Sequence, residues 1–274
     1  MKKQFKSGWK KLTRYFLLLI AMFIISGFIL AMPIPKTNTK AMPDTTLLKL
    51  SEELLYHVKT TEPTKDLETV LGNLNMQQLI AGLNNDDAIK TFWINMYNAW
   101  YQILAVREKQ NRPKIFTGKM ILIAGQNFSL DDIEHGILRK YRCKYSMGYL
   151  PKFFPGKLIK KLAVAFIDYR IHFALNCGAK SCPPIAFYSY EHINKQLDLA
   201  TKSFLNSETE FDEVSKEVRV SKIMDWFRAD FNEKKGIREI IKIFLKKDVT
   251  GYEVKFRDYN WDAAMHNFNE ETNE

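Results

Sequence analysis

The chain of 274 residues has 46% hydrophobic and 26% charged side chains, a balance that is typical of globular proteins and excludes an intrinsically disordered chain. Its formal net charge of +10 includes six basic residues in the first 14 positions, so the remainder carries only about +4. That charge is too small to indicate nucleic-acid binding, and three cysteines are too few for a disulfide framework in a chain of this length.

Residues 1–35 predict a membrane-targeting helix. The stretch 15–32 contains no charged residue and is closer in length to a spanning helix, which needs roughly 17 to 25 residues, than to a signal-peptide core. A cleavage site after Ala31 would have Ile29 at a position that prefers small residues, so we expect an uncleaved transmembrane anchor. A cleaved signal segment is the alternative. The leading basic residues predict that the following domain is membrane-anchored on the extracytoplasmic side, or secreted or periplasmic after cleavage.

We predict that residues 36–46 form a linker and that residues 47–274 form one globular domain. Helices are expected at 47–58 and 65–83. The next helix, 91–106, has no charged residue and is apolar over a broad arc, which predicts a central, buried helix. Asn95 and Asn98 fall on its remaining polar stripe, where buried amides need hydrogen-bond partners. They form either an internal network that fixes packing or part of a site.

Residues 119–129 predict a short hairpin, and 129–141 predict a helix that Ser129 and Asp132 cap. Glu134 falls in the middle of the apolar face of this helix, where a carboxylate is costly unless it is paired. His135 lies beside it. Glu134 therefore either pairs with a basic or backbone group to hold the helix in place or belongs to a site.

The segment 139–161 mixes lysine and arginine with tyrosine and phenylalanine, and no acidic residue occurs from 136 to 167. Such mixtures bind nucleic acid or anionic lipid. An exported domain does not meet nucleic acid, so we expect none as a partner. The segment is either a solvated loop or lid, or a surface for an anionic lipid or wall polymer.

Residues 170–176 alternate between apolar and polar side chains and predict a strand that ends at Cys177 and Gly178. A helix near 190–205, strands at 217–221 and 252–261, and helices at 222–231 and 237–245 follow. The sequence thus predicts a helix-rich α+β fold, a single domain with a small sheet behind the membrane-targeting helix.

Cys177 is the candidate nucleophile, because a sharp turn at the end of a strand exposes a side chain and frees backbone N–H groups for an oxyanion. His135 is the candidate base, Glu134 the group that orients it, and Asn98 or the Gly178 amide the polar support. Asn95, His172 and Asn176 are candidate substrate-binding or structural polar residues. Three alternatives stay open for Cys177: a disulfide with Cys182, a metal site with His172 and Cys182, or a buried, inert thiol.

Three motifs resemble a known family: FWINMYNAW (92–100), SLDDIEHGILR (129–139) and RIHFALNCGAKSCPP (170–184). Together they resemble the family catalogued as domain of unknown function 547, over a core of about residues 85–210, with weaker agreement at YNW (259–261). The family occurs in exported bacterial proteins and in plant and animal proteins, so the resemblance directs attention to the residues of the motifs without naming a reaction. Plant members keep a cysteine at the position of Cys177 and replace that of Cys182, which argues against an obligatory disulfide or metal across the pair.

The sequence therefore predicts a membrane-tethered domain that uses a cysteine–histidine pair as a thiol-dependent hydrolase or acyl transferase. The alternative is a non-catalytic cell-envelope binding module in which the same residues form a buried polar network. We expect no cofactor and no metal.

Overall fold

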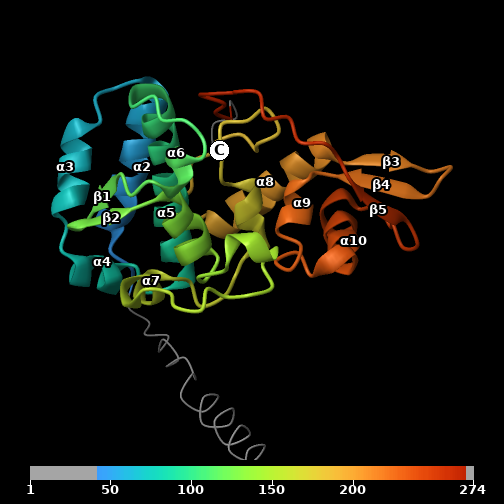
Figure 1. Ribbon diagram of the computed structural model, residues 1–274, viewed down its shortest axis with the longest axis horizontal. Coiled ribbons are helices and arrows are strands. Elements are labelled where there is room, and N and C mark those ends of the chain that lie inside the picture. Colours follow the sequence, from blue (N-terminus) through green and yellow to red (C-terminus); the bar gives the residue numbers. More distant parts are fainter. Residues whose placement is uncertain (1–41, 270–274) are drawn as a thin grey trace, which may run out of the picture. The chain divides into compact units, whose positions relative to one another are not determined.

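A single buried helix, α5 (Asp86–Gln102), lies at the centre of the fold, which the computed structural model describes over residues 42–269 (Figure 1). Every residue of α5 from Ala88 to Gln102 is buried, which confirms the predicted central helix. Asn85 caps its start by accepting a hydrogen bond from the Ala88 amide, and Asp86 and Asp87 lie at the positive end of the helix dipole. A π-helical turn, η1 (Ile103–Arg107), continues it.

The predicted membrane segment, 1–35, and most of the predicted linker lie outside the described residues. Within residues 42–269, no helix has both the length and the apolar character needed to cross a membrane.

Short elements surround α5 and share one hydrophobic core with it. Residues 65–83 form two helices instead of the single predicted one, because Asn75 caps a new helix by accepting from the amides of Gln77 and Gln78. The predicted hairpin is confirmed, with β1 and β2 antiparallel around a turn at Ala124 and Gly125, both of positive φ. The elements are α2 (Thr45–Thr60), α3 (Lys65–Asn73), α4 (Met76–Gly82), α6 (Lys114–Thr117), β1 (Ile121–Ile123) and β2 (Gln126–Phe128).

The helix predicted at 129–141 is a π-helix, η2 (Asp132–Leu138). Its wider turns are visible in hydrogen bonds that span five residues, such as Arg139 N–H to the Glu134 carbonyl and Tyr141 N–H to the Gly136 carbonyl. The predicted cap is present in reciprocal form: the Ser129 amide donates to the Asp132 carboxylate, and the Asp132 amide donates to the Ser129 hydroxyl. Short π-helical segments are frequently found at functional sites.

The prediction of a strand at 170–176 is wrong. Residues Tyr169–Phe173 form a 3₁₀ helix, η4, which Asp168 caps, and the chain then runs to Cys177 without a strand partner. The cause is tertiary. Asn98 of α5 accepts from the Asn176 amide and donates to the Ala174 carbonyl, so these main-chain groups bond to a side-chain amide and not to a neighbouring strand.

A second hydrophobic cluster forms around a three-stranded sheet in which β3 and β4 are antiparallel and β4 and β5 parallel. The strand predicted at 252–261 ends at Phe256. The following residues run back to the loop after Cys177, where Ala179 pairs with Ala263 and Ile185 with Phe268. The two sheets and the helical majority confirm a helix-rich α+β fold. The remaining elements are η3 (Lys144–Ser146), α7 (Lys157–Leu162), α8 (Ile193–Glu208), β3 (Glu210–Asp212), β4 (Glu217–Val220), α9 (Ile223–Trp226), α10 (Glu233–Leu245) and β5 (Glu253–Phe256).

Candidate functional site

A cavity of about 310 Å³ lies where the two hydrophobic clusters meet. Four candidate residues that are far apart in the sequence line it together: Glu134, His135, His172 and Cys177. The remaining wall is largely aromatic and includes two charged side chains, Asp131 and Lys144. The lining residues are Tyr97, Pro113, Phe116, Asp131, Glu134, His135, Lys144, Tyr145, His172, Leu175, Cys177, Cys182, Ile223, Trp226, Phe227, Tyr259 and Trp261.

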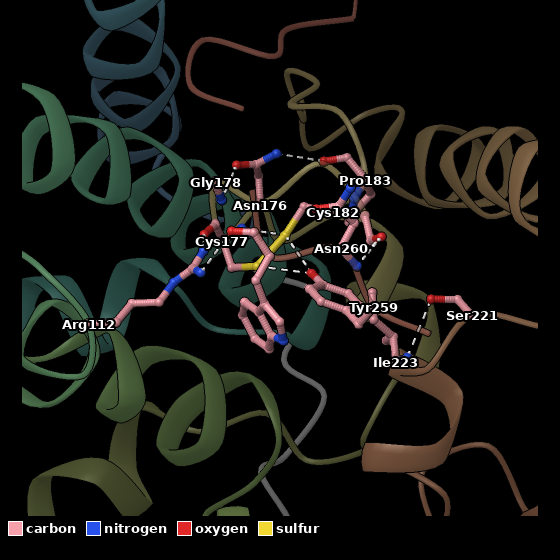
Figure 2. The surroundings of a disulfide bond; sticks show 12 residues. Arg112, Asn176, Cys177, Gly178, Cys182, Pro183, Ser221, Ile223, Tyr259 and Asn260 are labelled. Carbon is pink, nitrogen blue, oxygen red and sulfur yellow. Dashed lines mark hydrogen bonds between the residues drawn. A yellow bond between two sulfur atoms is a disulfide. The ribbon is translucent and has the colours of Figure 1, made fainter. Parts of the chain in front are cut away.

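Cys177 forms a disulfide with Cys182 on the cavity wall (Figure 2). The free thiol expected for a nucleophile is therefore absent, and the disulfide alternative is the one that the structure contains. Cys177 is partly exposed, whereas Cys182 is only 6% exposed. Around the pair, the Tyr259 hydroxyl lies 3.1 Å from Cys177 Sγ and 3.0 Å from Cys182 Sγ, and the Cys177 amide donates to Cys182 Sγ at 3.0 Å. Burial raises the pKa of Tyr259, so its hydroxyl stays protonated and can donate to sulfur.

Asn176 closes the loop that carries the disulfide. Its carbonyl oxygen accepts from the Gly178 amide at 2.8 Å, and its amide nitrogen donates to the Pro183 carbonyl at 2.7 Å (Figure 2). Gly178 has φ +67°, and a Cβ there would lie 2.5 Å from the Tyr101 ring, so only glycine fits. Because the Gly178 amide is already bonded to Asn176, it is not free to stabilise an oxyanion, which corrects the role expected for it.

Arg112 also holds the loop that carries the disulfide. The sequence alone did not indicate a role for this residue. Its Nη2 donates to the Cys177 carbonyl at 2.9 Å, and its guanidinium stacks over the Trp261 ring at 4.5 Å. Trp261 in turn packs on Tyr259 and Trp226. The YNW residues near the end of the chain thus reach the disulfide because the segment after β5 folds back over it.

Asp230 joins two of the motifs from outside them. Its Oδ2 accepts from His172 Nε2 at 2.8 Å and from Arg139 Nε at 2.6 Å, and all three side chains are at most 1% exposed. Burial acts to raise the pKa of Asp230, but the hydrogen bonds from His172 and Arg139 outweigh it and hold the pKa well below the ordinary value. Asp230 is therefore an ionised carboxylate that compensates the buried Arg139 charge.

Both histidines of the cavity are neutral. Burial lowers the pKa of His172 despite the neighbouring Asp230, and burial together with the Arg139 charge lowers the pKa of His135 well below its ordinary value. The Arg139 Nη1 lies 2.9 Å from His135 Nδ1; since arginine only donates, Nδ1 is the acceptor and Nε2 carries the proton. His135 Nε2 lies 3.7 Å from an Asp131 oxygen. Both ring nitrogens thus face groups other than Cys177, and the expected cysteine–histidine hydrogen bond is not formed in this structure.

Glu134 is a largely buried acid on the same wall. Its side chain is 14% exposed, and it accepts a hydrogen bond from the Tyr97 hydroxyl at 3.2 Å. Burial raises its pKa to about 7, although the nearby Arg139 charge acts to lower it. Because His135 is neutral, the 3.7 Å approach of His135 Nδ1 to Glu134 is not an ion pair. Glu134 is thus poised to release or accept a proton near neutral pH.

Asn95 and Asn98 do not line the cavity. Asn95 accepts from the Tyr188 amide and donates to the Tyr188 carbonyl, and Asn98 makes the corresponding pair of bonds to Asn176 and Ala174. Both side chains are fully buried. The internal network is therefore the observed state, and Asn98 acts on the disulfide loop by holding its backbone. Among the described residues, no group of three or more histidine, cysteine, aspartate or glutamate side chains is arranged to hold a metal ion.

These residues fall largely within one recognisable segment. Residues 80–205 match the model of a family described as protein of unknown function, DUF547. The resemblance seen in the three motifs is thus confirmed, and the match contains Glu134, His135, Arg139, His172 and the disulfide. Asp230 and Tyr259 lie beyond it, in the part that supplies the other side of the cavity. No curated protein and no solved structure matches the chain.

Proposed function

We propose that the domain carries out thiol–disulfide exchange, with Cys177 and Cys182 as the redox-active pair. The observation that carries this proposal is the position of the disulfide on the wall of a cavity that also holds Glu134. A disulfide that only braces the fold has no need of a cavity, a hydroxyl donor at both sulfurs and a nearby acid with a pKa of about 7.

The exposure of the two cysteine residues indicates the direction of the first step. A thiolate of a substrate dithiol attacks the more exposed Cys177 Sγ; a new S–S bond forms, the Cys177–Cys182 bond breaks, and Cys182 Sγ leaves as a thiolate. The Cys177 amide and the Tyr259 hydroxyl, each 3.0 Å from Cys182 Sγ, stabilise the negative charge on this leaving group.

The second step returns the substrate as a disulfide. Its remaining thiol loses a proton and attacks the substrate sulfur of the mixed disulfide, so that Cys177 Sγ leaves. Two electrons pass from the substrate dithiol to the cysteine pair, and the two protons end on Cys177 and Cys182. Glu134 is the group in the cavity that can relay these protons at neutral pH.

Two further functions use the same residues. A thiol-dependent hydrolase or acyl transferase would need Cys177 reduced, His135 turned away from Arg139 and an oxyanion donor other than the Gly178 amide. A non-catalytic envelope binding module is favoured by the aromatic wall, where Trp226 and Trp261 stack and Tyr259 packs against both, a surface on which a flat ligand could pack. We also propose that the domain is membrane-anchored and extracytoplasmic, because disulfides persist in the oxidising compartments outside the cytoplasm.

Cysteine variants in a Cys143→Ser background test the exchange proposal. In Cys182→Ser, Cys177 is left as an accessible thiol, and we expect it to form a mixed disulfide with oxidised glutathione. In Cys177→Ser, the buried Cys182 should react roughly tenfold more slowly. The Cys177–Cys182 pair of the otherwise unchanged protein should have a reduction potential between about −270 and −120 mV, measured by equilibration with dithiol buffers. A potential below about −300 mV, typical of structural disulfides, contradicts the proposal.

A further inference from the structure

Large apolar side chains are exposed along one segment that begins at the cavity with Tyr145 and continues beyond it. Of the five large apolar side chains that are more than three-quarters exposed within residues 42–269, four lie between 145 and 166: Tyr145, Phe153, Phe154 and Phe166, at 86%, 86%, 91% and 78%. The fifth is Val214, alone on the β3–β4 turn. Exposed apolar side chains that gather on one surface are typical of sites of protein or membrane interaction.

Four exposed lysines accompany the two adjacent phenylalanines. Helix α7 turns Ile159 and Leu162 inward, with Ile159 against Gly136, and leaves Lys157, Lys160 and Lys161 outward. Together with Lys152, these lysines have no ion pair within the part of the chain that the structure describes. We call Lys152, Phe153, Phe154, Lys157, Lys160 and Lys161 the docking face.

The described chain begins at the same end of the molecule. Near its start, the Asp44 amide donates to the Gly82 carbonyl at the end of α4. The segment after α7 reaches the neighbouring start of α5, where the amides of Ala165 and Phe166 donate to the Asp86 carboxylate at 2.7 and 2.9 Å. Figure 1 shows α4 and α7 along one edge of the molecule, whereas β3 and β4 project at the opposite end.

We propose that the docking face rests on an anionic lipid bilayer. The apolar stretch 15–32, which precedes this end of the domain by about ten residues, predicts a membrane segment and would keep the face close to a bilayer surface. Lysines are attracted to the negative surface potential of anionic lipid, and phenylalanine side chains enter the boundary between headgroups and acyl chains. A soluble polyanion such as a wall polymer would attract the lysines but offers no apolar phase for Phe153 and Phe154.

A fluorescent reporter on the full-length chain tests this proposal independently of the disulfide. In a Cys143→Ser background, Phe154→Cys gives one reactive thiol for an environment-sensitive dye, because Cys177 and Cys182 are paired. Val214→Cys, on the β3–β4 turn and 96% exposed, is the matched control. Both proteins are reconstituted in vesicles of phosphatidylcholine, with and without phosphatidylglycerol, and quenched by lipids that carry a spin label in the acyl chain.

We expect the dye at 154 to shift to the blue and to be quenched when phosphatidylglycerol is present, and the dye at 214 to stay in water. Replacing Lys157, Lys160 and Lys161 by Gln should lower the ratio of docked to undocked domain by about fivefold per lysine, and added salt should act in the same direction. Equal signals at the two positions, or no dependence on phosphatidylglycerol, overturn the proposal. Shielding of the dye at 154 by a soluble polyphosphate without vesicles also overturns it and assigns the face to a wall polymer.

Discussion

Two buried polar regions meet near the disulfide and differ in kind. On α5, Asn95 and Asn98 are neutral amides, and each satisfies one backbone N–H and one carbonyl of a neighbouring segment. The second region consists of ionisable groups: Glu134 on the cavity wall, and the pair of Asp230 and Arg139 behind His172, with the pKa values of the two acids shifted in opposite directions. The amides fix where the loops lie, whereas the ionisable groups differ in charge at neutral pH, with Asp230 ionised and Glu134 close to its pKa of about 7. The buried polar residues thus divide into a scaffold of neutral amides and a group of ionisable side chains.

Removing the charge of Asp230 should have the largest effect. Asp230→Asn leaves Arg139 buried without a counter-charge, and the free energy of unfolding at pH 7 should fall by about 3–5 kcal/mol in urea titrations. Because the folded-state pKa of Asp230 is lowered, the stabilisation is complete above the ordinary carboxylate range and is lost as the pH falls below it. Asp262→Asn is the control, since its ion pair with Lys180 is exposed, and it should change stability by less than about 1 kcal/mol. A small loss at Asp230 would mean that the charged region is not a paired unit.

Removing the buried amide of Asn98 should lower the free energy of unfolding slightly less, and by the same amount at every pH. Asn98→Leu leaves the Ala174 carbonyl and the Asn176 amide buried without partners, and we expect a loss of about 2–4 kcal/mol. The loss should be the same at pH 5 and pH 8, since neither partner titrates. Asn73→Leu, exposed at the end of α3, is the matched substitution and should be nearly neutral. A strong pH dependence at Asn98 would erase the distinction between the two regions.

The smallest effect is expected at Glu134 and has the opposite sign. Its folded-state pKa of about 7 lies above the ordinary value of 4.5, so wild-type stability from this group is complete below pH 4.5 and is lost as the pH rises through 7. Glu134→Gln cannot ionise and keeps an acceptor for Tyr97. The variant should therefore gain stability relative to wild type between pH 5 and pH 8, by at most about 3 kcal/mol. Parallel pH profiles for the two proteins would show that Glu134 has an ordinary pKa.

The local parts of the fold could be predicted from the sequence because their causes are local. The uncharged stretch 91–106 indicated a buried helix, the turn at Ala124 and Gly125 follows from the apolar runs that flank it, and Ser129 and Asp132 form the predicted cap. Glu134 was identified as a buried acid from its position on an apolar helix face. The incorrect prediction of a strand at 170–176 shows what an alternating pattern leaves undetermined. A strand needs a neighbouring strand to bond to its backbone, and here the Asn98 side chain forms those hydrogen bonds instead.

What the sequence by itself determined is therefore the central helix, the α+β class and the motif residues that belong to the cavity. The state and partners of those residues depend on contacts between distant segments. The Cα atoms of Cys177 and Cys182 lie 6.1 Å apart because Asn176 closes the loop between them, and Asp230 reaches Arg139 and His172 from a position beyond the family match. Whether a cysteine is a free thiol or part of a disulfide, and whether a histidine is charged or neutral, depends on which groups lie within a few ångströms of it. These neighbours come from distant parts of the sequence, so only the tertiary structure decides them.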